Sequence, residues 1–284
     1  MSETAAPLVD SEARPVETVP LNRDMAPHET SYVYAIGRVV PRFPSPGVEK
    51  EALQALGRGD TAGLTDREAL HKLLSERRHR YLARNICYVF AIEGMETYIL
   101  QPRDPADFEL LIEAIRPAPR PTDIDVVIGV RGPLAPPEMC NGLVVPVVLF
   151  DNLYSFDLDG LVGALPRPSD VPADRFTPAA EELLARIMQA SDNAGATEED
   201  RALNYLAVRY AQIYGNAAEQ FAHGAALTSI STQPSRLSST RRIVDVVFTF
   251  TNRTTDVASR WFVRVDVTEQ FPFLVSKLAP YVAR

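Results

Sequence analysis

The stretch IVDVVFTFTNRTTDVASRWFVRVDVT, residues 243–268, contains two segments in which apolar and polar side chains alternate. IVDVVFTFT (243–251) and RWFVRVDVT (260–268) flank the polar stretch TNRTTDVAS. A period of two residues is typical of a half-buried β-strand, whereas an amphipathic helix repeats its apolar residues every three to four positions. The pair therefore predicts two antiparallel strands joined by a long loop.

Outward from this pair, the pattern changes to that of helices. We expect one helix from Thr177–Pro178 and another from Thr197, where Asp200 completes a capping box; the second runs on towards Phe221 with a break near Gly215. A short helix is expected from about Gln270. The N-terminal half is predicted to mix helices at 47–57, from Thr65, and at 104–116 with strands at 32–40, 86–94, 95–103, 124–132, 143–150 and 153–157.

Helices and strands thus occur without regular βαβ alternation, which predicts an α+β fold with a mostly antiparallel sheet in one compact domain. Residues 1–30 carry four prolines and no aromatic residue, so we expect a disordered tail there and a folded domain over 31–284. The proline-rich stretch 166–178 is the candidate junction between two subdomains.

The composition excludes several classes of protein. Acidic residues outnumber basic ones 37 to 29 in the 284 residues, and the net charge of −8 argues against a nucleic-acid-binding protein. No apolar run approaches the roughly 20 residues that a membrane-spanning helix needs. With only two cysteines and no signal sequence, we expect a cytoplasmic protein.

No catalytic motif stands out. The sequence has neither the G-x-S-x-G elbow of serine hydrolases nor a phosphate-binding loop, and it contains only four histidines. The residues themselves therefore favour a noncatalytic protein.

The two cysteines allow two interpretations. Cys87 lies on an apolar strand and Cys140 in the proline-rich turn PPEMCNGL, 53 residues apart, with His71 sixteen residues before Cys87. Thiolate and imidazole are the ligands that zinc prefers. A free cysteine is also among the residues most often buried in a core, so both readings stay open.

A group of arginines stands in LSERRHRYLARN: Arg77, Arg78, Arg80 and Arg84. Four guanidinium groups on one helix end are suited to an anionic partner, such as an acidic leader peptide. The alternative is a solvated face that the helix dipole favours.

Several segments resemble a known family, the C-terminal domain of the cyanobactin maturation protease PatG, which is also found at the end of PatA. The similar segments are YVYAIGRVVPRFPSPGVEKE (32–51), 63–107, 120–148, DNAGATEEDRALNYLAVRY (192–210) and 241–275. The resemblance implies a domain of unknown function from pathways that make ribosomal, post-translationally modified peptides, here without the protease domain. It also implies zinc, with His71, Cys87 and Cys140 as matching ligands and His79 as the candidate fourth.

From this resemblance we expect a noncatalytic accessory or scaffold protein that binds a precursor peptide or a partner enzyme. Structural zinc and a homodimer are further expectations. The first alternative is a zinc-dependent peptide hydrolase, with Glu138 as its carboxylate base. The second is a purely structural interaction domain without metal.

Overall fold

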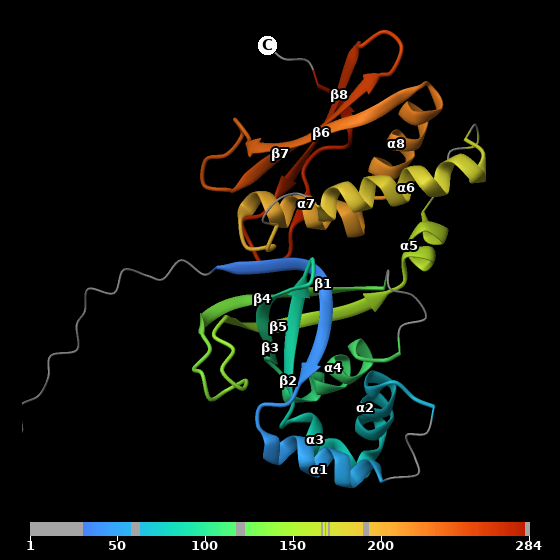
Figure 1. Ribbon diagram of the computed structural model, residues 1–284. Helices are drawn as coiled ribbons and strands as arrows, with labels where there is room; N and C mark the ends of the chain where they lie inside the picture. Colours follow the sequence, from blue (N-terminus) through green and yellow to red (C-terminus); the bar gives the residue numbers. More distant parts are fainter. Residues whose placement is uncertain are drawn as a thin grey trace, which may run out of the picture. The chain divides into compact units, whose positions relative to one another are not determined.

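The apolar run that begins at Tyr32 forms the first strand of a five-stranded barrel in this computed structural model (Figure 1). The structure describes residues 31–57, 63–117, 123–165, 167, 169, 171–189 and 193–281. The predicted tail lies outside the described residues. The elements are β1 (Tyr32–Arg42), α1 (Pro46–Leu56), α2 (Asp66–Ser75), η1 (Arg77–His79), α3 (Arg80–Ala83), β2 (Cys87–Ile92), β3 (Met95–Pro102), η2 (Pro105–Asp107), α4 (Phe108–Ala114), β4 (Ile124–Leu134), β5 (Pro146–Phe156), α5 (Leu158–Ala164), α6 (Ala173–Met188), α7 (Glu198–Arg209), α8 (Gln212–Ala222), β6 (Ala225–Pro234), β7 (Ile243–Asn252), β8 (Ala258–Asp266), β9 (Phe273–Leu274) and β10 (Ala279–Pro280).

The barrel closes in the order β1-β2-β3-β5-β4, and β4 pairs with β1. Its neighbouring strands are antiparallel except for β3 and β5, which are parallel. Gly37 lies where two strands come close, because a Cβ there would stand 2.4 Å from the carbonyl oxygen of Ala91. Only glycine fits such an approach.

Strand β1 contributes to two hydrophobic cores. Val33 and Ala35 point into the barrel, whose core also contains buried side chains of α1, α2, α3 and α4. Tyr34 and Ile36, on the opposite face of the strand, belong to the core beneath the C-terminal sheet. The alternation of a strand thus lets one segment serve both cores.

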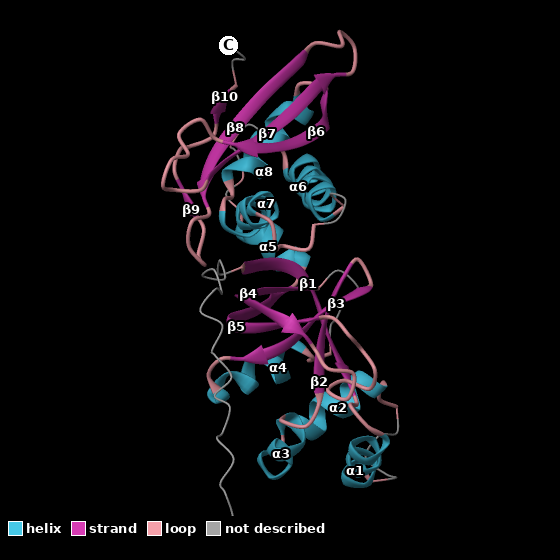
Figure 2. Cartoon of the chain, turned by 90° about the vertical axis from the view of Figure 1, so that its left-hand side faces the viewer, coloured by secondary structure: helices cyan, strands magenta, loops and turns pink. Residues whose placement is uncertain are grey.

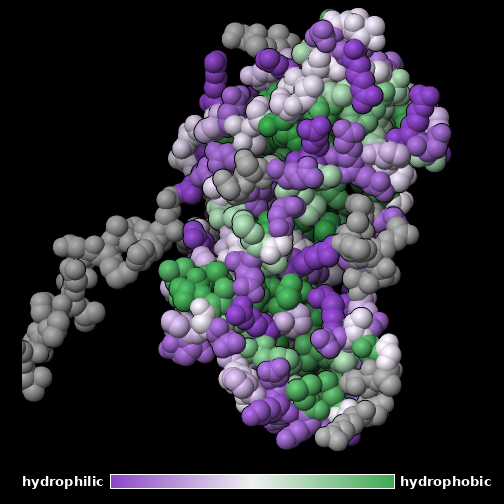
Figure 3. All heavy atoms as spheres, in the orientation of Figure 1, coloured by the Kyte–Doolittle hydropathy of each residue, from purple (hydrophilic) through white to green (hydrophobic). Residues whose placement is uncertain are grey.

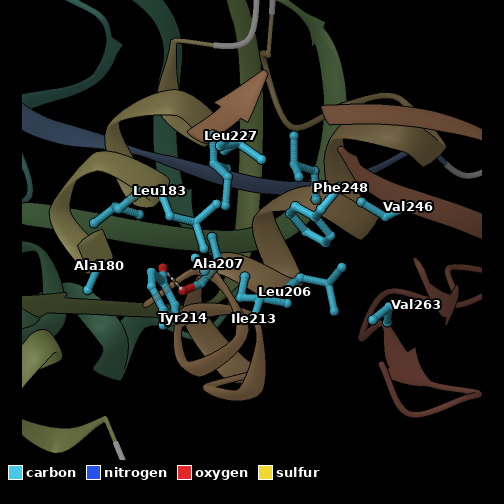
Figure 4. Packing of buried hydrophobic residues seen from close by; sticks show 14 of the residues in the cluster. Ala180, Leu183, Leu206, Ala207, Ile213, Tyr214, Leu227, Val246, Phe248 and Val263 are labelled. Carbon is cyan, nitrogen blue, oxygen red and sulfur yellow. Dashed lines mark hydrogen bonds between the residues drawn. The ribbon is translucent and has the colours of Figure 1, made fainter. Parts of the chain in front are cut away.

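The C-terminal sheet has the order β10-β8-β7-β6, and β9 pairs with β8 beside β10. Helices α6, α7 and α8 cover one face of it (Figure 2). Leu183, Leu206 and Ile213 from the three helices pack with Phe248 of β7 (Figure 4). This is the larger of the two cores, and it is the one that includes Tyr34 and Ile36.

A buried amide network joins α7 and the loop before it to β1. The Asn204 side chain donates to the carbonyl oxygen of Tyr34 at 2.8 Å and to the Asn193 amide oxygen at 3.0 Å. The Tyr34 N–H donates to the carbonyl oxygen of Gly195 at 2.8 Å. Gly195 has φ 69°, and a Cβ there would stand 2.4 Å from the Tyr34 carbonyl oxygen, so glycine is required.

The predicted α+β class is confirmed, and so are most of the local signals. Thr65 and Thr197 each form the predicted capping box with the acidic residue three positions later. The hairpin between β2 and β3 turns at Glu93 (φ 49°) and Gly94 (φ 80°), the left-handed pair that a tight hairpin requires.

Four details of the prediction were wrong, and one strand was missed. The helix placed at Thr177–Pro178 begins at Ala173, inside the predicted junction 166–178. The helix from Thr197 ends at Arg209 instead of near Gly215, and the segment from Gln270 contains β9 rather than a helix. The two strand pieces at 143–150 and 153–157 are one strand, β5, in which the register with β4 shifts around Asp151. Strand β6 was not predicted.

Candidate functional site

Cys87 and Cys140 form a disulfide. Cys87 begins β2, and Cys140 lies in the turn between β4 and β5, with 5.8 Å between their Cα atoms. Both side chains are buried, packed with Ile99 and Val147. The turn reaches β2 because its backbone reverses tightly at Asn141 (φ 47°) and Gly142 (φ 84°), where the Gly142 N–H donates to the Pro137 carbonyl oxygen at 2.7 Å.

This pairing corrects the ligand set predicted for zinc. A sulfur atom in a disulfide is not a thiolate, so neither cysteine is available to a metal while the bond is formed. His71 lies on α2 and His79 in η1, and in the part of the chain that the structure describes, no three His, Cys, Asp or Glu side chains gather as a metal site. The four predicted ligands are therefore not brought together.

The two histidines and Glu138 lie in different surroundings. His79 is within 3.8 Å of Glu76, measured from Nε2 to Oε2, and its buried Nδ1 has no hydrogen-bond partner among the described residues. Burial lowers the pKa of His71, and the Glu113 carboxylate opposes this shift. Glu138, the base of the hydrolase alternative, is exposed on the turn that carries Cys140.

The arginine cluster divides into paired and unpaired members. Arg78 donates to Glu76 at 2.7 Å, and Arg80 forms an ion pair with Glu109 at the start of α4. Arg77 and Arg84 are exposed and have no ion pair within the described ranges. The cluster therefore offers an anion two guanidinium groups rather than four.

Arg84 also borders a cavity of about 170 Å³ that reaches the disulfide. The cavity lies between the start of β2 and the end of β3, and it is lined by Arg84, Asn85, Ile86, Cys87, Tyr88, Ile99, Leu100, Gln101, Pro102, Phe108 and Met139. Pockets for drug-sized ligands are usually about 300–1,000 Å³, so this one suits a single side chain rather than a small molecule. Its rim is polar at Arg84, Asn85 and Gln101, and its floor is apolar.

Residues 170–281 match the PatG C-terminal family. The predicted resemblance to this PatG domain is thereby confirmed. A solved structure described as "PatG Domain of Unknown Function" aligns with 88% of this chain and 98% of its own, at 22% identity and a TM-score of 0.70. That likeness extends the PatG domain fold to the barrel, which precedes the segment matched by sequence. A search of curated proteins finds no match.

The cavity and the disulfide lie in the barrel, outside the segment that matches the PatG C-terminal family. The sequence brought Cys87 and Cys140 together only as zinc ligands, and neither their disulfide nor the cavity that Arg84 and Cys87 line was predicted. An even number of cysteines was the available signal for the bond. Phe108 and Met139 carried no signal, because only the closure of the barrel brings them to β2. No described helix is long and apolar enough to span a bilayer.

Proposed function

We propose that this protein is a noncatalytic accessory domain of a ribosomal peptide maturation pathway, and that it binds a precursor peptide at the Arg84 cavity. The likeness to the PatG domain supports the pathway. The observation that carries the binding site is an unpaired arginine at the rim of a cavity the size of one side chain. An acidic leader segment is the expected ligand, with a pathway enzyme as the alternative partner.

The charges around the cavity support an acidic ligand. Arg84 and Arg77 are the exposed members of the arginine cluster that have no ion pair among the described residues, and of the two only Arg84 lines the cavity. Glu76 and Glu109 are already paired with Arg78 and Arg80, which leaves Arg84 for a carboxylate from outside. Charge-assisted hydrogen bonds between arginine and a carboxylate are about twice as strong as neutral ones.

The test is fluorescence anisotropy with a labelled acidic leader segment of a cyanobactin-type precursor. Arg84→Ala should weaken binding by about fivefold to tenfold, in line with loss of one partly buried charge contact. Arg78→Ala is the matched control, since it removes the same charge from a neighbouring exposed arginine and should change binding by less than about twofold. Equal effects of the two variants would contradict the proposal. So would the absence of binding at a protein concentration of about 100 μM.

Two other results would replace the proposal of a noncatalytic, peptide-binding domain. Binding to a pathway enzyme but not to the peptide would assign a scaffold role. Turnover of the peptide that is lost in Glu138→Gln with zinc retained would favour the zinc-dependent hydrolase.

A further inference from the structure

The two edges of the C-terminal sheet are built differently. At one edge, β9 and β10 have two residues each, and Pro272 and Pro280 lie at or beside them. Very short strands and prolines are the usual means by which proteins keep an edge from pairing with another chain. At the other edge, β6 has ten residues, Ala225–Pro234, and no strand among the described residues pairs with its outer side.

Strand β6 has little protection against pairing. It contains no charged residue, and its proline stands at the last position. Thr228, Ser229, Ser231 and Gln233 are exposed. The register with β7 shifts between Leu227 and Ser229, a bulge that leaves most of the strand in regular pairing. Alternate N–H and C=O groups of an edge strand point away from the sheet, so β6 presents a row of backbone hydrogen-bonding groups.

A groove of about 230 Å³ lies beside this strand, between β6 and the C-terminal end of α6. It is lined by Arg186, Gln189, Leu227, Thr228, Ser229 and Ile230. Arg186 is the only charged residue of this lining, is exposed, and has no ion pair within the part of the chain that the structure describes. The groove therefore combines an apolar floor, backbone polar groups and one unneutralised positive charge.

We propose that β6 binds an extended peptide as an added strand, with an acidic side chain of the peptide placed in the groove beside Arg186. Backbone hydrogen bonds to β6 supply the affinity in this mode of recognition, and a side-chain pocket supplies the specificity. The free guanidinium group of Arg186 selects the acidic residue.

A second copy of the chain is a less suitable occupant than a peptide. Stable homodimer interfaces are larger and more apolar than average surface, whereas the exposed side chains of β6, apart from Pro234 at its end, are hydroxyls and an amide. Each copy also carries a net charge of −8. On the face shown in Figure 3, hydrophobic residues appear in separate patches between hydrophilic ones rather than as one continuous surface.

This site is separate from the Arg84 cavity, which lies against β2 and β3 of the barrel. Strand addition at β6 can therefore fail while binding at Arg84 succeeds, and the reverse also holds. The variants at each site are tested with both peptides, so that the two outcomes are distinguished.

The probe is a blocked eight-residue peptide of alternating threonine and valine with one central glutamate. Added as a strand, it directs alternate N–H groups towards β6. Two further versions of the probe carry N-methyl groups on one or the other alternating set of amides. One version should lose affinity by at least about tenfold, and the other should stay within about twofold, because only one set faces the protein. Similar affinities for the two versions would overturn the proposal.

Hydrogen exchange locates the site. The probe should slow exchange at the backbone amides of residues 225–234, and slow exchange elsewhere with none in this segment would overturn the proposal. Protection of β6 that rises with protein concentration in the absence of probe would assign the edge to a second copy instead.

The charge is tested by reversal. Arg186→Glu should weaken binding of the glutamate probe by about tenfold and restore binding when the central glutamate is replaced by lysine. Arg175→Glu is the matched control, since Arg175 is also exposed on α6 but lies about 16 Å along the helix from Arg186. Equal effects of the two substitutions would contradict a role for the groove.

Discussion

Removal of the Cys87–Cys140 disulfide should lower the free energy of unfolding by about 4 kcal/mol. The bond closes a loop with a sequence separation of 53 residues. A crosslink across a loop of this length removes about 14 cal/mol/K of entropy from the unfolded chain, which is about 4 kcal/mol at 25 °C. Since domains are stable by about 5–15 kcal/mol in total, this bond accounts for a large part of the stability of the fold.

Urea unfolding separates this entropic effect from the loss of packing. Three samples are compared: the oxidised protein, the same protein with reductant, and the double variant Cys87→Ala, Cys140→Ala. Reduction keeps both sulfur atoms in the core, so its effect reports the crosslink. The alanine variant adds the cost of the removed atoms. The unfolding midpoint should fall by more than about 1 M urea on reduction.

Reductant should have no effect on the double variant, which serves as the control. Loss of less than about 1 kcal/mol on reduction would refute the argument, because it would mean that the unfolded chain gains little freedom when the loop is opened. The same unfolding curves would show whether the reduced protein still unfolds in one transition.

Three further outcomes follow from particular groups. Burial raises the pKa of Asp125 above its ordinary 3.8 despite hydrogen bonds from Val39 and Ser155. The folded protein therefore holds this proton more tightly than the unfolded chain, and the stability that the group contributes should decline as pH rises from about 4. The free energy of unfolding of Asp125→Asn, measured in urea against pH, should lack this decline, and the same decline in both proteins would contradict the assignment. Gly195→Ala should lower the free energy of unfolding by at least about 2 kcal/mol. Gly94→Ala should lower it by less in the same assay, because Gly94 also has a positive φ but nothing lies within 4 Å of the added carbon. Equal losses would show that the close approach of Gly195 to β1 is unimportant. Native mass spectrometry should give oxidised protein with no zinc on the cysteines, and one zinc per chain that is lost in Cys140→Ser would contradict the disulfide.

The predictions from sequence succeeded where the signal is local. Alternation identified the strands around residues 243–268, and the capping threonines identified two helix starts, because these patterns depend on neighbours within a few residues. Strand β6 was missed because the bulge between Leu227 and Ser229 interrupts the alternation of its core-facing side chains, and five of its ten residues are serine, threonine or glutamine. Its position became evident only from its pairing with β7.

The site was predicted residue by residue but not as an arrangement. Nothing near Arg80 indicates that Glu109, almost thirty positions later, neutralises it, or that Arg84 stays unpaired. The parallel pairing of β3 with β5 brings the turn of Cys140 to Cys87, and such long-range closure leaves no periodic trace in the sequence. The cysteines were therefore interpreted as zinc ligands or as core thiols rather than as partners in a disulfide.

The double use of β1 sets the limits within which this molecule can be divided. The segment that matches the PatG C-terminal family begins at residue 170, yet the core of that segment includes Tyr34, Ile36 and Val126 from the barrel. A fragment cut at residue 170 would carry an incomplete core, with the apolar inner faces of α6 and α7 open to water. The segment that matches the family is thus shorter than the segment that can fold. We expect any folded fragment of this chain to include β1.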